Sequence, residues 1–225
     1  MHSALSGIAV LFLLVATACS AGRGAPTAPQ TPTDGAPDRS TPSVSVDAAP
    51  TFSATPHPEV IPSAPTGPLL EGTALTGTSE DDRFRLNIHA DQDRYRAGQE
   101  LRVTASLAFL GDEREVTVSG SGTGLVVFGV ERDQPPIRID PAATSDCRPS
   151  RLRLDTPMEV SFFKTGGYDP AEPLAAFYES YLLPRELRLA AGTWTISAIA
   201  SFTEGSDCTG RGHDLRASVR VVVEP

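Results

Sequence analysis

Apolar and polar residues alternate with a period of two over most of the chain from Arg83 onward. Because successive side chains of a β-strand point to opposite faces, short alternating runs indicate strands with one buried face. Glycine, proline and aspartate separate the runs and are typical of the turns between strands. The candidate strands are residues 84–88, 101–107, 115–118, 125–130, 152–154, 160–163, 187–189, 193–202 and 215–223. Seven to nine short strands at this spacing predict an all-β domain, a β-sandwich.

One segment breaks this pattern. Residues 173–183 (PLAAFYESYLL) carry apolar side chains at helical spacing between two prolines, which predicts one short inserted helix. A helix inserted between strands can contact a partner, or it can cover an open end of the sandwich. Aromatic residues gather in and just before this segment. The candidate partner-binding residues are Tyr168, Phe177, Tyr178 and Tyr181.

The first third of the chain has a different composition. Of the 20 prolines, 11 fall between Pro26 and Pro68, among Thr, Ala and Ser residues with almost no large apolar side chain. Such a segment cannot bury enough surface to fold. The sequence therefore predicts a Pro/Thr/Ser-rich disordered stalk over residues 19–70 and a β-sandwich domain over residues 71–225.

The N-terminus indicates export. Residues 8–15 (IAVLFLLV) form an apolar run too short to span a bilayer, with the length of a signal-peptide core. Small residues and then Cys19 follow, and this order resembles the bacterial lipobox, in which the new N-terminal cysteine receives diacylglycerol. Two features depart from that pattern: Ala16 stands where leucine is usual, and residues 1–7 contain no Lys or Arg. We expect a signal peptide over residues 1–18, lipidation of Cys19, and an anchor in the outer face of the cell membrane. Secretion as a soluble protein is the alternative.

The cysteine count supports this interpretation. The chain has three cysteines, and an odd cysteine in an exported protein needs an explanation. Cys147 and Cys208 lie in the predicted domain, in polar, loop-like contexts, so we expect a disulfide between them and Cys19 as the spare. A metal site is the rival interpretation. Neither C-x-x-C spacing nor a nearby histidine pair supports it.

Two motifs resemble those of bacterial immunoglobulin-like modules. Residues 95–103 (YRAGQELRV) match Y-x-x-G-x-x-L-x-V, and residues 189–196 (LAAGTWTI) resemble a late turn and strand of these modules. A similar arrangement occurs in a small family of bacterial proteinase inhibitors with an immunoglobulin-like fold, and the chain also resembles uncharacterised lipoproteins of GC-rich bacteria. The resemblance covers about 20 residues and implies an immunoglobulin-like sandwich. It implies no active residue. Trp194 lies in an alternating strand, which predicts a core residue, with a platform for a ligand as the alternative.

Charge and motifs narrow the classes of function. The predicted domain carries 24 acidic and 17 basic residues, which argues against nucleic acid as a partner because its phosphates would be repelled. Ser161 and Lys164 match S-x-x-K, but in a strand the two side chains would point to opposite faces. His89 and His213 have no serine, cysteine or ligand pattern near them in the sequence. We expect no metal, no cofactor and no catalysis.

The leading hypothesis is therefore a non-catalytic cell-surface lipoprotein. Its β-sandwich would bind a protein or glycan, or serve as a structural module of the envelope. The alternative is a secreted proteinase inhibitor, which would present an exposed loop to a protease. The loops considered for that role are residues 111–114 and 132–137.

Overall fold

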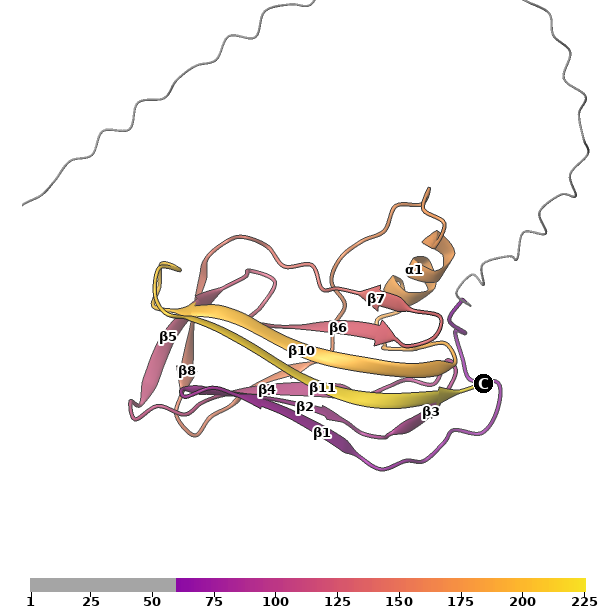
Figure 1. Cartoon of the computed structure of the whole chain (residues 1–225), viewed down its shortest axis with the longest axis horizontal. Coiled ribbons are helices and arrows are strands. Elements are labelled where there is room, and N and C mark those ends of the chain that lie inside the picture. The colour runs from indigo at the N-terminus through magenta and orange to yellow at the C-terminus, as the bar shows by residue number, and fades with distance from the viewer. Residues whose placement is uncertain (1–59) are drawn as a thin grey trace, which may run out of the picture. The chain divides into compact units, whose positions relative to one another are not determined.

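Eleven strands and one helix form the regular structure of residues 60–225, the part of the chain that the computed structural model describes (Figure 1). They are β1 (Leu75–Glu80), β2 (Phe84–Ala90), β3 (Arg94–Arg96), β4 (Val103–Phe109), β5 (Glu115–Gly120), β6 (Val126–Arg132), β7 (Ile137–Ile139), β8 (Arg148–Arg153), β9 (Met158–Ser161), α1 (Ala175–Leu182), β10 (Gly192–Glu204) and β11 (Gly212–Glu224). Two sheets pack together, so the predicted all-β sandwich with one short helix is confirmed. The strand count exceeds the predicted seven to nine.

The two sheets differ in size. One contains β1, β2, β4 and β9 in that order, and the other follows the order β3, β11, β10, β5, β8. On the edge of β10 opposite β11, β6 pairs with residues 194–200 in the middle of the strand and β5 with its last three residues. The strand β7 extends the sheet beyond β6, and β3 alone pairs in parallel, with β11.

Alternating side chains from both sheets fill the core. The side chains on the inner face of β10 are fully buried: Trp194, Ile196, Ala198 and Ala200. The Trp194 indole N–H donates to the Ala190 carbonyl at 2.9 Å, which satisfies its one polar group. The tryptophan is a core residue.

Three strands escaped the sequence pattern, and β1 shows why. Its inward positions are Leu75, Gly77 and Ser79, so it carries little apolar signal. A Cβ atom at Gly77 would lie 2.1 Å from the carbonyl oxygen of Ser218 in β11. Only a glycine allows the two sheets to approach so closely at this edge. The other two missed strands, β3 and β7, have three residues each, whereas predicted residues 187–189 contribute only an isolated bridge at Leu187.

The folded part begins before the predicted boundary at residue 71. Ile61 is only 5% exposed, and its backbone N–H donates to the Ser180 hydroxyl of α1 at 3.1 Å. Arg188 donates to the carbonyls of Ser63, at 2.7 Å, and Gly98, at 2.8 Å. Residues 60–70 thus lie against the sandwich, and the sequence-based boundary is too late.

Both ends of the described chain lie at one end of the sandwich. Arg96 donates from Nε to the Pro68 carbonyl at 3.1 Å and from a terminal nitrogen to a Pro225 oxygen at 2.6 Å. We call this the helix end, because α1 lies there too (Figure 1). From it, the 13-residue strands β10 and β11 run about 40 Å to their connecting loop. That loop holds Cys208, so we call the opposite end the disulfide end.

Candidate functional site

Of the four predicted partner-binding aromatic residues, the three on α1 pack in or against the core. Phe177 and Tyr181 are 1% and 2% exposed, and Tyr168 and Tyr178 are half-buried. The Tyr178 ring packs edge-on against Phe177, with centroids 5.6 Å apart. Two of the four side chains therefore cannot reach a partner in this conformation. The structure favours the interpretation of α1 as a cover over this end of the sandwich.

Lys164 fixes the end of α1. It is the one lysine in the chain, and its ammonium group donates to three carbonyls: Tyr181 at 2.5 Å, Pro184 at 2.8 Å and Glu186 at 2.7 Å. The last carbonyls of a helix have no partner within the helix, so a lysine placed there stabilises them. Burial lowers the pKa of Lys164 to about 8, and the Glu186 carboxylate opposes this shift. All three donors are in use, which leaves Lys164 no role as a catalytic base for Ser161.

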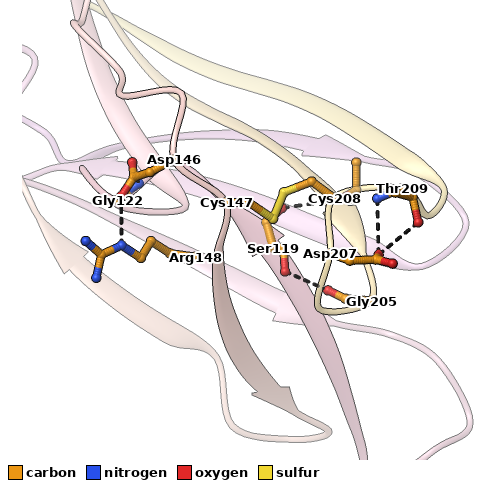
Figure 2. Close-up of a disulfide and its surroundings, with 10 residues drawn as sticks. Ser119, Gly122, Asp146, Cys147, Arg148, Gly205, Asp207, Cys208 and Thr209 are labelled. Atoms are coloured by element: carbon orange, nitrogen blue, oxygen red, sulfur yellow. Dashed lines mark hydrogen bonds and ion pairs between the residues drawn. A yellow bond between two sulfur atoms is a disulfide. The ribbon is translucent and has the colours of Figure 1, made fainter.

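The opposite end is closed by the predicted disulfide, which is confirmed (Figure 2). The Cα atoms of Cys147 and Cys208 are 6.0 Å apart, and the bond joins positions separated by 61 residues. Cys147 directly precedes β8, and Cys208 lies in the β10–β11 loop. The bond therefore ties the edge strand of the larger sheet to the tip of its longest hairpin.

An aspartate orders the backbone on each side of the bridge (Figure 2). Asp146 accepts from the Gly122 N–H at 2.8 Å and from Arg148 Nε at 2.7 Å, and it also accepts from the Thr144 hydroxyl. The Thr144 hydrogen bond, followed by that of Arg148, holds the pKa of Asp146 well below its usual range. Asp207 accepts from the Thr209 N–H and hydroxyl. The similar Ser-Asp-Cys sequences thus build two ordered turns.

A charged cluster beneath these loops links the two sheets. The His213 side chain is 1% exposed and lies between two carboxylates, with Nδ1 2.6 Å from Asp81 Oδ2 and Nε2 3.0 Å from Glu204 Oε1. Carboxylates only accept, so both hydrogen bonds form together only when the ring carries two protons. Arg83 lies 3.4 Å from Glu204, and Arg211 pairs with Asp82 at 2.7 Å.

Asp81 is one of the two carboxylates in this cluster whose pKa is lowered, Asp82 being the other. Burial works against the charge of Asp81, but hydrogen bonds from His213 and from the N–H groups of Arg83 and Phe84 outweigh that effect and lower its pKa. Sequence reasoning missed the cluster, because Asp81 and His213 are 132 positions apart. No local pattern indicates such a pair.

A depression of about 350 Å³ lies between the loops of the disulfide end. It is lined by Ser119, Ser201, Thr203, Cys208, His213 and Asp214, among others. Hydroxyl and carboxylate groups at its surface can exchange hydrogen bonds with a polar ligand. Both nitrogens of His213 are already bonded to carboxylates, so the ring has none free to activate a nucleophile. Within residues 60–225, no three His, Cys, Asp or Glu side chains are placed to hold a metal ion.

The loops considered for protease inhibition are short in the structure. Arg132 is 3% exposed, donates from Nε to the Pro135 carbonyl at 3.1 Å and lies over the Trp194 ring, so the 132–137 loop does not present this arginine. In the 111–114 loop, Glu113 pairs with Arg83 at 3.3 Å. Neither geometry favours an extended loop offered to a protease.

Comparisons of the chain with protein-family models, with curated proteins and with solved structures found no match. The resemblance to immunoglobulin-like modules therefore stays a prediction beyond the sandwich architecture. Residues 1–59, with the predicted signal peptide, Cys19 and most of the stalk, lie outside the described residues. Within residues 60–225, no helix has the length and apolar character needed to cross a membrane.

Proposed function

We propose that this chain is an exported, lipid-anchored, non-catalytic module that presents the disulfide end of its sandwich to a protein or glycan partner. One observation carries the proposal. Arg96 holds Pro68 and Pro225 together at the helix end, while the cross-linked loops lie about 40 Å away. A chain tethered through its N-terminal segment would therefore direct the disulfide end away from the tether.

The cysteines support the anchored location. A bridge between Cys147 and Cys208 suits an oxidising compartment outside the cytosol. It leaves Cys19, after the apolar run of residues 8–15, as the third cysteine and the candidate for lipidation. The proposed location is the outer face of the cell membrane.

The disulfide end is suited to binding because its loops are fixed in advance. The bridge, the two aspartate turns and the hydrogen bond from Ser119 Oγ to the Gly205 carbonyl, at 2.8 Å, hold three segments in one arrangement. Loops that are already ordered lose less conformational entropy when a partner binds. The same rigidity would serve a structural module of the envelope, which the proposal includes.

Metabolic lipid labelling tests the anchor. We expect the wild type to take up the label and to partition into detergent, and Cys19→Ser to lose the label and move to the aqueous phase. Cys147→Ser, which keeps Cys19, is the matched control and should stay labelled. A wild type without label would contradict lipid anchoring.

Photo-cross-linking on intact cells tests the presented surface. A photoreactive residue at the exposed Ser206 of the disulfide end should capture a defined partner. The same residue at Leu183, 71% exposed at the helix end, should not capture that partner. Capture of that partner from Leu183 alone, or no capture from Ser206, would contradict the proposed orientation.

A further inference from the structure

The helix end contains a second depression, of about 400 Å³, that none of the preceding functions uses. It lies along the edge of β4, between two segments that contact that edge. The Phe162 N–H donates to the Val103 carbonyl at 2.9 Å, and the Leu101 N–H donates to the Leu187 carbonyl at 2.8 Å. Because β9 ends at Ser161, the edge of β4 is left open between these contacts, and the depression forms there.

The lining combines an apolar floor with polar walls. Leu101, Val103 and Leu187 are 2–3% exposed and form the floor with half-buried Phe162. Thr104 and Ser161 face each other as register partners of β4 and β9, and both are exposed. Their hydroxyls therefore lie side by side at the surface of the depression.

Two arginines of the lining lack protein partners. In the part of the chain that the structure describes, Arg102, Arg114 and Arg185 are the arginines whose side chains make no ion pair, hydrogen bond or ring contact. Both Arg102 and Arg185 line this depression, and Arg114 does not. A guanidinium carries donors in a planar fork that matches the two oxygens of a carboxylate.

The acidic residues of the lining leave an excess of positive charge. Glu100 and Glu186 also line the depression. Glu186 interacts with the charge of Lys164, which itself donates to the Glu186 carbonyl at 2.7 Å. The negative charge of Glu100 then offsets only one of the two positive charges of Arg102 and Arg185. One remaining positive charge suits a monoanion better than a dianionic phosphate.

We propose that this depression binds a small carboxylate-bearing ligand. Arg102 and Arg185 pair with the carboxylate, the Thr104 and Ser161 hydroxyls donate hydrogen bonds, and the apolar floor takes the body of the ligand. Ligand sites commonly combine an apolar surface with a few polar groups in this way. The proposal does not depend on lipid anchoring or on the disulfide end.

Isothermal titration calorimetry of the full chain tests the proposal with two pairs of probes. The first pair is N-acetyl-leucyl-alanine and its C-terminal amide, and the second is glucuronate and glucose. Binding of at least one carboxylate, with its neutral counterpart at least about tenfold weaker, supports the site. The carboxylate that binds more tightly identifies a peptide terminus or an acidic sugar as the source.

Variants separate this site from a general charge effect. Arg102→Gln and Arg185→Gln should each weaken carboxylate binding about tenfold, because each removes a charge-assisted hydrogen bond. Arg114→Gln, which removes an equally unpaired arginine outside the depression, should leave binding unchanged. All three side chains are exposed, so the fold should tolerate their replacement. No binding of either carboxylate, equal binding of the neutral probes, or an equal effect of Arg114→Gln would overturn the proposal.

Discussion

The two ends of the sandwich are closed by different chemistry. At the helix end, residues 60–70 and α1 pack on the core, and Lys164 and Arg188 bond to backbone carbonyls. At the disulfide end, a covalent bond and ion pairs between arginines and carboxylates join the segments. The helix end should therefore respond to the loss of buried packing and donors, and the disulfide end to reductant and to acid.

Removal of the disulfide should have the largest effect. Cys147→Ser combined with Cys208→Ser opens a loop of 61 residues, which the chain-entropy account equates with about 4 kcal/mol of unfolding free energy. Denaturant unfolding measures the loss, and hydrogen exchange should show lost protection of residues 205–211 but not of α1. Cys19→Ser, which leaves the bridge intact, serves as control. Equal loss of protection at both ends would show that the ends are not independent.

Replacement of Lys164 should have the next largest effect on stability. Lys164→Met keeps most of the side-chain volume but leaves the carbonyls of Tyr181, Pro184 and Glu186 without this donor. We expect a loss of about 2–3 kcal/mol, measured by denaturant unfolding, with increased hydrogen exchange in α1. Arg185→Gln, at an exposed and unpaired position, should change stability by less than about 0.5 kcal/mol. If Lys164→Met is as stable as wild type, the lysine does not hold the helix end.

Ile61 tests whether residues before position 71 belong to the fold. Ile61→Ala removes a side chain that is 5% exposed and should cost about 2 kcal/mol in thermal unfolding experiments. Val60, its neighbour, is 52% exposed, so Val60→Ala should be close to neutral. Equal and negligible effects would place the boundary later, as the sequence composition predicted.

The smallest expected effect is on the stability of the fold at low pH. The folded-state pKa of Asp81 lies below its usual value, so its stabilising contribution is present above about pH 4 and is lost as pH falls through the lowered pKa. Asp81→Asn should therefore show a shallower loss of stability below pH 4 than wild type. The carboxylate is 28% exposed, so solvent limits the difference. Glu172→Gln, at an exposed position, should follow the wild-type profile; identical profiles for all three proteins would exclude a role for Asp81.

Features set by local periodicity were predictable from sequence, and features set by distant contacts were not. The alternation around Trp194 and the apolar spacing around Phe177 identify β10 and α1, because burial imposes the period of the local structure. The cysteine count was enough to predict the bridge. Position 77 carries no such signal in the sequence, because the need for a glycine there comes from the Ser218 carbonyl in the other sheet.

The candidate sites were less predictable than the fold. The aromatic stripe of α1 was compatible with a contact for partners or with a cover over the sandwich, because the same spacing serves core packing, and Phe177 and Tyr181 are buried. The His213 cluster and the pair of Arg102 and Arg185 both join residues from separate elements. Their proximity follows from how the strands are arranged, which sequence spacing does not specify.

The position of β1 has a mechanical consequence. A pull on the segment before Leu75, with a partner held at the disulfide end, acts along the axis of β1, since Leu75 lies toward the helix end and Glu80 toward the disulfide end. The six register pairs between β1 and β2 would then be loaded together in shear rather than opened one at a time. Before that load reaches β1, the contacts of Ile61 and Ser63 with Ser180 and Arg188 must break. Under such a load, the segment that precedes the sandwich would therefore detach before β1 does.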